Sequence, residues 1–416
     1  MSQAAFLSAE QAAALAESFG TPVFVYSEAE LLKRAEQALS FPCRHGLTVR
    51  YAMKALPTAA ILRLFDAQGI HIDASSGYEA ERAMRAGIAP DHIQLTAQEM
   101  PSNLADLLEQ GVLFNACSLR QLARYGELRP GSEVSVRINP GLGSGHSQRT
   151  NVGGPSSSFG IWHEHLDTVK SVAEQHGLRI TGMHTHIGSG SDPETWVKCA
   201  QLGIGIAAQL PDVTRLSLGG GYKIARMPDE SPADLRAIGA RMLSEFELFE
   251  QRQGRKLHLE IEPGTFLVAN AGALISTVID VVDTGAQGMN FIKLDTGMSD
   301  ILRPSMYGAQ HPITFFAADG GERPEASCMV VGHCCESGDI LTPERGNPEA
   351  LAPRMLPLPE PGDLAVIDGA GAYCASMAAR NYNSFPESAE VLLGTDGTPR
   401  LIRKRQTLDQ FLVNEV

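Results

Sequence analysis

The feature that most constrains the fold is an alternation of short β-rich runs with longer helical patterns between residues 47 and 262. The segments between the runs, such as 58–68 and 232–252, carry apolar residues at helical spacing and turn signals at their ends. Eight such units in a row predict a TIM-type α/β barrel of eight parallel strands; an open doubly wound sheet is the less favoured alternative. The candidate strands are residues 47–52, 70–73, 93–96, 113–116, 134–139, 179–186, 213–218 and 257–262.

The pattern changes after about residue 270, where short alternating strands are separated by Gly and Pro. Since 416 residues exceed what one hydrophobic core usually supports, we expect a second, C-terminal antiparallel β-domain. Residues 22–26 (PVFVY) form a further strand that is expected to join it, and the Pro-rich stretch 343–362 is expected to be a surface loop. The expected division is an N-terminal segment 1–40, a barrel 41–270 and a β-domain 271–416.

Charge and composition exclude several classes of partner. The 34 Lys and Arg residues against 48 Asp and Glu residues give a net charge of −14, which argues against nucleic acid or an anionic membrane as a partner. No apolar stretch is long enough to span a bilayer, and the start of the chain lacks the basic-then-apolar order of a secretory signal. The seven cysteines are odd in number and mostly scattered, unlike a disulfide framework, so a cytoplasmic protein is expected.

One lysine stands out at the end of the first barrel strand, in the string YAMKA at residues 51–55. A lysine in an apolar neighbourhood can lose its proton and act as an amine nucleophile, as Schiff-base chemistry requires, although an isolated one more often snorkels from a strand end. Asp73, Asn139, His186 and Glu262 would also lie at the carboxyl ends of barrel strands, where such barrels build their sites. The long Gly/Ser-rich loop at 141–160 follows one of these strands and is expected to be functional.

Further strings follow YAMKA along the chain: HTHIGSG at 184–190, GGG at 219–221, EIEPG at 260–264, CESGD at 335–339 and GAY at 371–373. Together they resemble the fold-type III pyridoxal-phosphate decarboxylases, and most closely the diaminopimelate decarboxylases of bacteria. The resemblance extends from FGTPV at 19–23 to LIRKRQT at 401–407. It implies pyridoxal-phosphate-dependent decarboxylation of an amino acid, by default meso-diaminopimelate to L-lysine, with no metal ion.

The resemblance also implies roles for single residues in holding the cofactor. Lys54 would be the Schiff-base lysine, Glu262 would pair with the pyridine nitrogen, and His186 would stack on the ring. The three glycines would let the backbone approach the phosphate closely, as loops at helix N-termini and anion-binding nests do. The residues expected to bind pyridoxal phosphate are Lys54, Asp73, His186, Ser189, Gly219, Gly220, Gly221, Glu262, Gly264 and Tyr373.

The resemblance implies a second set of residues that act on the substrate. Cys335 would come from the neighbouring subunit of a homodimer and help control protonation of the carbanion, while Glu336 would bind the distal amino group. The substrate-binding residues are expected to be Arg303, Tyr307, Glu336 and Tyr373. Arg303 and Tyr307 would hold the distal carboxylate, a task suited to the two-pronged donor of an arginine.

Two departures from the family pattern concern the substrate. The family's Glu-Pro-Gly-Arg ends in Thr265 here, and its Asn-Ser-Arg-Pro has Phe385 in place of the arginine. Losing a charge-assisted hydrogen bond typically costs about 1.5–3 kcal/mol, which is one to two powers of ten in preference. A decarboxylase acting on a siderophore precursor or another carboxylated amine of secondary metabolism is therefore the alternative.

Two readings from other classes are weaker. An alanine-type racemase would share the barrel and the lysine, but the CESGD string is typical of decarboxylases. A non-catalytic carrier of pyridoxal phosphate is disfavoured because both Lys54 and Cys335 are present.

Overall fold

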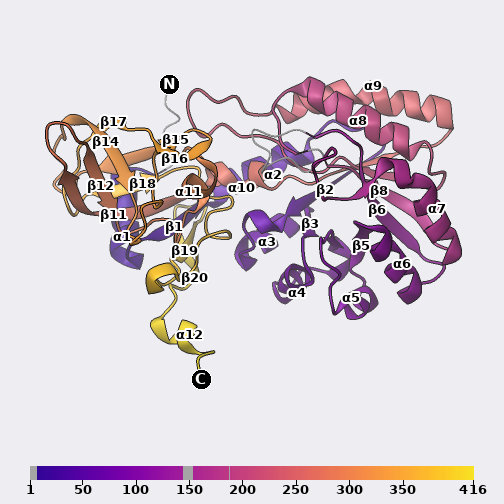
Figure 1. Cartoon of the computed structure of the whole chain (residues 1–416), viewed down its shortest axis with the longest axis horizontal. Coiled ribbons are helices and arrows are strands. Elements are labelled where there is room, and N and C mark those ends of the chain that lie inside the picture. The colour runs from indigo at the N-terminus through magenta and orange to yellow at the C-terminus, as the bar shows by residue number, and fades with distance from the viewer. Residues whose placement is uncertain (1–6, 144–152, 187) are drawn as a thin grey trace. The chain divides into compact units, whose positions relative to one another are not determined.

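The computed structural model describes residues 7–143, 153–186 and 188–416, so part of the 141–160 loop and residue 187 of the HTHIGSG string lie outside the described residues (Figure 1). The chain divides into two compact units. The barrel unit comprises Leu32–Ile224 and Ser231–Leu267, and the β-unit comprises Met1–Leu31, Ala225–Glu230 and Val268–Val416.

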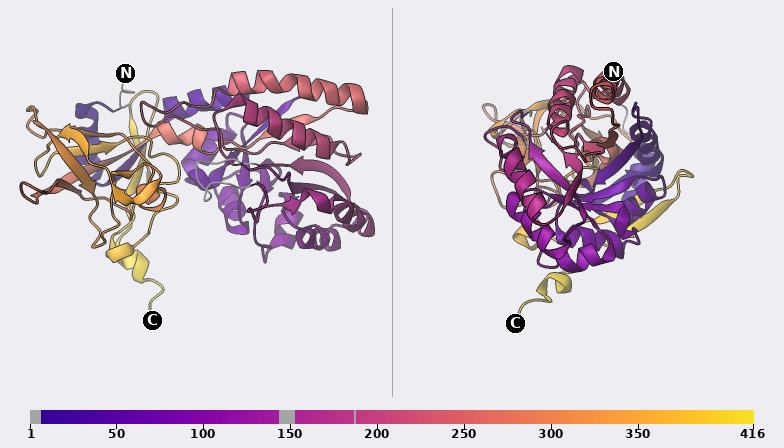
Figure 2. Two further views of the ribbon diagram at one scale, coloured as in Figure 1. Left: turned by 45° about the horizontal axis from the view of Figure 1, so that its top comes forward. Right: turned by 90° about the vertical axis from the view of Figure 1, so that its right-hand side faces the viewer.

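The barrel unit contains a closed ring of parallel strands. Its strands are β2 (Leu47–Ala52), β3 (His71–Ala74), β4 (Ile93–Leu95), β5 (Leu113–Ala116), β6 (Glu133–Asn139), β8 (Arg179–His184), β9 (Arg215–Ser217) and β10 (His258–Ile261). They pair in chain order, and β10 returns to pair with β2, which closes the ring; the short β7 (Ile161–Trp162) pairs only with β6. The right-hand view of Figure 2 shows the helices of this unit outside its strands. The predicted TIM-type barrel is thus confirmed.

The helices of the barrel unit alternate with its strands. They are α2 (Glu28–Leu39), α3 (Ala59–Asp66), α4 (Gly77–Arg85), α5 (Leu104–Gln110), α6 (Leu119–Leu128), α7 (Leu166–Gln175), α8 (Pro193–Ala207), α9 (Leu235–Gln253) and α10 (Thr265–Val268). Several begin at a side chain that caps the first turn: Ser76, Ser118, Asp192 and Asp234 each accept a backbone N–H. On α3, Ile61, Leu62 and Phe65 are buried, so the apolar residues at helical spacing in the sequence form the buried face of this helix.

The interior of the barrel is unusually polar, since bulky branched residues normally fill such barrels. Side chains alternate across a strand, so Arg50 faces away from Tyr51, whose ring contacts Phe65 of α3 with centroids 4.8 Å apart. Arg50 therefore points into the barrel. Buried polar side chains occur on the strands or strand ends all round the ring: Arg50, Asp73, Gln94, Thr96, Asn115, Ser135, Arg137, His184, Ser217, Glu260 and Glu262.

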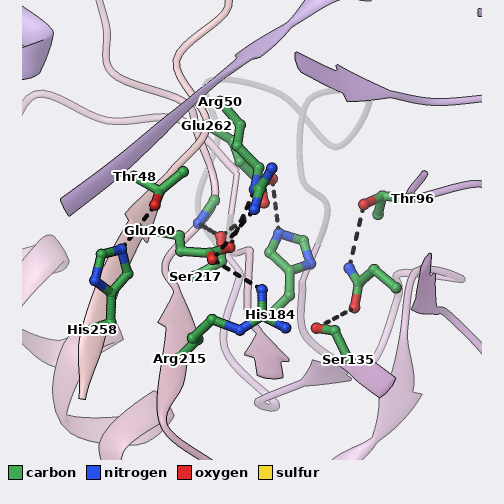
Figure 3. Close-up of polar contacts among 12 residues, drawn as sticks. Thr48, Arg50, Thr96, Ser135, His184, Arg215, Ser217, His258, Glu260 and Glu262 are labelled. Carbon is green, nitrogen blue, oxygen red and sulfur yellow. Dashed lines mark hydrogen bonds and ion pairs between the residues drawn. The ribbon is translucent and has the colours of Figure 1, made fainter. Parts of the chain in front are cut away.

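Inside the barrel, ion pairs compensate the charges of Arg50, Arg215 and Glu260 (Figure 3). Arg50 Nε and Arg215 Nη1 each lie 3.3 Å from a different carboxylate oxygen of Glu260. Burial would raise the pKa of Glu260, but the two guanidiniums outweigh it and the pKa is lowered. Glu260 is therefore ionised, and it neutralises cations contributed by two neighbouring strands.

The β-unit is built around a mostly antiparallel sheet, as predicted. Its strands follow the order β17–β14–β12–β11–β1–β19–β20, and β18 pairs with both β11 and β13. Only β1 with β19 and β12 with β14 pair in parallel. The strand bounds are β1 (Val23–Ser27), β11 (Gly272–Asp283), β12 (Asn290–Leu294), β13 (Ile313–Phe316), β14 (Glu325–Val331), β15 (Pro343–Glu344), β16 (Asn347–Leu351), β17 (Arg354–Pro357), β18 (Leu364–Ile367), β19 (Ala389–Leu393) and β20 (Pro399–Arg403).

The expectation of a surface loop at 343–362 was wrong, because β15, β16 and β17 lie within it. Pro343 begins β15 and Pro357 ends β17, which are positions where a strand tolerates a missing N–H group. The proline content was therefore compatible with strand ends as well as with a loop.

Three helices belong to the β-unit: α1 (Ala9–Phe19), α11 (Arg303–Tyr307) and α12 (Leu408–Leu412). Helix α1 begins with a capping box between Ser8 and Gln11, and it buries Ala12 and Leu15 against the apolar face of the sheet. The sheet face beneath it is formed by Val23, Val25, Ala273, Ile275, Val366, Ala389 and Val391. No helix among the described residues is long and apolar enough to cross a bilayer.

The ion pairs of Glu260 lead to a prediction about the stability of the fold. Substituting Glu260→Gln should lower the free energy of unfolding by about 3 kcal/mol at neutral pH, because it leaves the buried Arg50 and the partly exposed Arg215 without a counter-charge. The urea midpoint measures this, and the exposed pair of Arg124 and Glu127, 2.8 Å apart, supplies the control: Glu127→Gln should change stability by less than about 0.5 kcal/mol.

The stability difference between wild type and Glu260→Gln should also depend on pH. A lowered carboxyl pKa stabilises the folded state only while the group is ionised, so the difference between wild type and Glu260→Gln should be full at neutral pH and shrink as the pH falls through the lowered pKa of Glu260. Equal midpoints at pH 7 would show that the pairs contribute nothing.

Candidate active site

Lys54 lies immediately after β2, in the single turn Met53–Ala55. Met53 and Ala55 are buried while Lys54 itself is exposed, so the apolar surroundings expected from the sequence are supplied by its chain neighbours. The next strand places Asp73 opposite Ala52 in the parallel register. The ammonium of Lys54 is close enough to lower the pKa of Asp73, though it does not set the final value.

Asp73 is a buried carboxyl that favours its protonated form. Burial, followed by the negative charge of Glu262, raises its pKa to about 8 against the opposing effect of Lys54. Its Oδ1 atom has no hydrogen-bond partner among the described residues. The charges of Lys54 and Glu262 thus act on Asp73 in opposite directions, and Asp73 is a group that can hold a proton near neutrality.

Glu262 has the opposite protonation. It follows β10 directly, is 6% exposed, and its carboxylate accepts a hydrogen bond of 2.8 Å from Ser217 Oγ and lies 3.0 Å from His184 Nε2 (Figure 3). Burial would raise its pKa, but His184 and Ser217 outweigh burial and hold the pKa well below the ordinary range. The end of β10 therefore presents a buried, ionised carboxylate.

His186 is a neutral imidazole beside this carboxylate. Burial and then the charges of Arg137 and His184 lower its pKa, and its Nδ1 atom has no hydrogen-bond partner among the described residues. Its ring packs so closely against Gly219 that a Cβ atom at that glycine would lie 2.6 Å from Nδ1. Only a glycine fits there, because the backbone also has a φ of +72°.

The next two glycines pack against backbone. A Cβ atom at Gly220 would lie 2.1 Å from the carbonyl oxygen of Glu262, and one at Gly221 would lie 1.7 Å from that of Gly188. The loop that carries Ser189 runs beside them, since Gly190 N donates to Gly221 O at 3.0 Å. Two loops of the barrel unit, 188–190 and 219–222, therefore lie against each other at the strand ends, with Ser189 on one of them.

The remaining barrel residues of the predicted site lie close by. Ala52 N donates to Pro263 O at 3.3 Å, and a Cβ atom at Gly264 would contact both Ala52 and Ala55. Gly264 is thus adjacent to the turn that carries Lys54. At the end of β6, Asn139 bonds the backbone of Gly141 and Gly154, which fixes the two described ends of the 141–160 loop.

In the β-unit, the CESGD string forms a loop wound around Asp339. This carboxylate is 2% exposed and accepts backbone N–H groups of Cys334 at 2.9 Å and Met298 at 2.7 Å. Cys335 is exposed, and its N–H donates to Asn383 Oδ1 at 2.8 Å. Glu336 is bonded by the Tyr382 hydroxyl at 3.4 Å. The loop thus presents a thiol and a carboxylate on a framework held from inside by Asp339.

The other predicted residues of the β-unit lie on short, tightly bent segments. Arg303 and Tyr307 are one turn apart on α11, so both side chains lie on one side of that turn. Tyr373 has a φ of +56°, a strained value for a residue with a side chain. Two residues earlier, a Cβ atom added at Gly371 would lie 1.8 Å from the carbonyl oxygen of Val268. The backbone here is fixed by close packing.

The sequence analysis missed several residues that set the properties of this site. His184 and Ser217 keep Glu262 ionised, Arg137 helps keep His186 neutral, and Asn383 and Tyr382 bond the Cys335–Glu336 segment. The sequence did carry a signal for His184, Ser217 and Arg137. These polar residues lie on barrel strands, whose side chains would ordinarily be apolar on both faces. No such signal marks Asn383 and Tyr382, which are distant in sequence from the loop they bond.

These residues fit pyridoxal phosphate. The ionised, buried carboxylate of Glu262 suits a protonated pyridine nitrogen, and the neutral ring of His186 can lie flat on an aromatic system. The glycines at 219–221, which leave no room for side chains, form a cradle where a phosphate can approach backbone N–H groups. Lys54 and Asp73 lie on the neighbouring strands β2 and β3.

Known proteins show the same architecture. Residues 29–269 match the family model described as the pyridoxal-binding domain of pyridoxal-dependent decarboxylases. The diaminopimelate decarboxylase of Escherichia coli K12 is 38% identical, covering 99% of this chain and 97% of the relative, and that of Streptomyces coelicolor is 37% identical over 97% of this chain and 91% of its own.

Solved structures agree. A crystal structure of diaminopimelate decarboxylase has a TM-score of 0.92 at 36% identity and covers 100% of this chain and 98% of that one. The Helicobacter pylori diaminopimelate decarboxylase complexed with L-lysine has a TM-score of 0.85 at 27% identity, with 97% of this chain and 98% of that chain covered. The chain described here therefore belongs to the pyridoxal-dependent decarboxylases, within the family of the diaminopimelate decarboxylases.

Proposed function

We propose that this enzyme removes one carboxylate from meso-diaminopimelate to give L-lysine. Its relatives over nearly the full chain are diaminopimelate decarboxylases, and the residues that bind this substrate in the family pattern, Arg303 and Tyr307, are retained. The observation that carries the proposal is the ionised, buried Glu262 on β10, next to the strand that ends at Lys54. A carboxylate kept charged at such a place has a cation to stabilise.

Pyridoxal phosphate, when bound, supplies an acceptor for the electron pair that remains on the substrate as carbon dioxide leaves. Glu262 keeps a proton on the pyridine nitrogen, because its own lowered pKa prevents it from taking that proton. Lys54 Nζ provides the covalent attachment, and the neutral His186 packs on the ring. Ser189 and the backbone of Gly219–Gly221 hold the phosphate, and Asp73 lies near the ring, where it holds a proton up to about pH 8.

The β-unit provides the substrate's other contacts. Arg303 and Tyr307 bind the distal carboxylate, Glu336 binds the distal amino group, and Tyr373 lies at the phosphate. Cys335 Sγ delivers the proton that replaces the lost carboxylate, and it does so in the active site of the partner subunit. The enzyme is therefore an obligate homodimer. The scattered, unpaired cysteines fit a reducing compartment, so we place it in the cytoplasm.

A second candidate function is favoured by two residues. Thr265 and Phe385 replace family arginines, and Phe385 stacks on His333 with centroids 3.5 Å apart, so an aromatic pair stands where a cation is expected. The alternative substrate is a carboxylated amine from siderophore or other secondary metabolism. Carbon dioxide release should be measured over meso-diaminopimelate, lysine, ornithine and citryl-diamine conjugates; the proposal requires diaminopimelate to give the highest kcat/KM.

The attachment of the cofactor to Lys54 can be mapped chemically. Reducing the holoenzyme with borohydride makes the link between cofactor and lysine permanent, and peptide mapping should place the label on Lys54. Lys54→Ala should show no label and should lose essentially all turnover. Lys293, which lies 3.3 Å from Asp280 on the surface, is the matched control, and Lys293→Ala should be labelled like wild type. A label on Lys293 or Lys223 would refute the assignment.

Sharing of the active site between subunits can be tested by mixing. Lys54→Ala and Cys335→Ala should each be inactive alone, and their mixture should regain activity, since one of the two sites in a mixed dimer has both groups intact. If subunits exchange randomly, half of the dimers are mixed, so recovery should approach about a quarter of wild-type activity. No recovery when subunit exchange is demonstrated by mass spectrometry would show that each site is built within one chain.

A further inference from the structure

A half-buried arginine of the β-unit, Arg226, is not among the residues expected from the family pattern. It lies on the segment Ala225–Glu230, and its Nε atom donates to the carbonyl oxygen of Gly369 at 2.9 Å. Its Nη2 atom is buried and has no hydrogen-bond partner among the described residues. A Cβ atom at Gly369 would lie 3.0 Å from the Arg226 side chain, so the glycine leaves the room that this guanidinium fills.

Arg226 lies close to a second cation, Arg303. Burial and then the charge of Arg303 lower the pKa of Arg226 to about 9. The Nε atom of Arg303 is also buried and without a partner among the described residues. Glu230 is the one nearby carboxylate that favours the charged form of Arg226, but its Oε2 atom already accepts the backbone N–H groups of Arg226 and Met227, at 2.8 Å and 3.1 Å.

Two further neighbours, His311 and Cys374, add no negative charge. His311 is 1% exposed, its Nδ1 atom lies 2.9 Å from Asp368 O, and burial together with Arg226 and Arg303 lowers its pKa, so it stays neutral. Burial raises the pKa of the Cys374 thiol to about 11, so it is neutral as well. Arg226 and Arg303 are thus near enough to repel each other and both act on His311, and each has a buried donor without a partner among the described residues. Such an arrangement is costly unless an anion binds to both.

We propose that Arg226 and Arg303 together bind the distal carboxylate of the substrate, so that Arg226 provides the cation that is missing at Thr265. This rests on the proposed function, in which Arg303 contacts that carboxylate. Two arginine forks can give a carboxylate up to four charge-assisted hydrogen bonds, more than the single arginine and tyrosine considered above. Arg226 is thus a specificity-determining residue, and Thr265 no longer implies weak recognition of a dicarboxylic amino acid.

Product binding tests the pair without requiring turnover. Decarboxylation at one end of diaminopimelate leaves the distal carboxylate on L-lysine, whereas cadaverine lacks it. Calorimetric titration of the holoenzyme gives the dissociation constants of both ligands. In wild type L-lysine should bind more tightly, and Arg226→Gln should reduce that preference about 10- to 100-fold, with cadaverine affinity unchanged. The KM for diaminopimelate should rise by a similar factor, with kcat less affected.

Two further variants show whether an effect of Arg226→Gln comes from losing the positive charge, from losing the two-pronged guanidinium or from general damage to the fold. Arg226→Lys keeps the charge but loses the fork, so it should lose a smaller part of the preference; it also decides the question if Arg226→Gln does not fold. Arg345→Gln is the matched control, because Arg345 is half exposed and pairs with Asp229 of the same segment at 2.8 Å; it should leave both affinities unchanged.

The outcomes separate this inference from the proposed function. If wild type does not prefer L-lysine, or if the Arg226 variants keep the full preference, Arg226 does not bind the carboxylate, even if diaminopimelate is turned over. If wild type releases no carbon dioxide from diaminopimelate but its preference for L-lysine depends on Arg226, the proposed function fails and the carboxylate site stands.

Discussion

A carboxylate inside a barrel must be compensated where it lies, and the compensation of buried charge is the constraint that organises this enzyme. Glu260 is held between Arg50 and Arg215, and Glu262, two residues further along β10, is held by His184 and Ser217. At Asp73, burial and the charge of Glu262 outweigh the charge of Lys54, and the group shifts toward its neutral form. Two carboxyl groups at the same strand ends therefore differ in protonation, which is how one site can both hold and release protons.

The β-unit also contains a buried carboxylate, which is stabilised by backbone N–H groups instead of side-chain donors. Asp339 is buried and has no ion pair with a cation among the described residues; the N–H of Cys334 and the N–H of Met298, from another segment, each bond one of its oxygens. Gly297 and Gly332 pack directly against it, since a Cβ atom at either would lie 2.2 Å from its carboxylate. The exposed Cys335 and Glu336 thus stand on a loop whose shape is set by one buried acid. The positions of both side chains therefore depend on a residue that is itself 2% exposed.

Much of this architecture could be predicted from the sequence, because strands and helices leave periodic traces. All eight barrel strands were located to within about two residues at each end, and the mostly antiparallel second domain was also predicted. The partners of Glu262 and Glu260 could not be assigned, since which inward side chains meet depends on the stagger of strands far apart in the chain. Arg226 was not predicted for the same reason: nothing in its sequence neighbourhood distinguishes it until the fold brings it near Arg303.

The loop Gly219–Gly221 has a consequence for the evolution of such chains. Two of its glycines press on backbone carbonyls, which, unlike side chains, cannot move aside for a larger residue. A descendant that lost its chemistry would still need all three glycines to close this end of the barrel. Their presence in a relative is therefore evidence of a common shape and says little about activity. Lys54 is exposed, so the packing of the barrel does not require a lysine there as the loop requires its glycines.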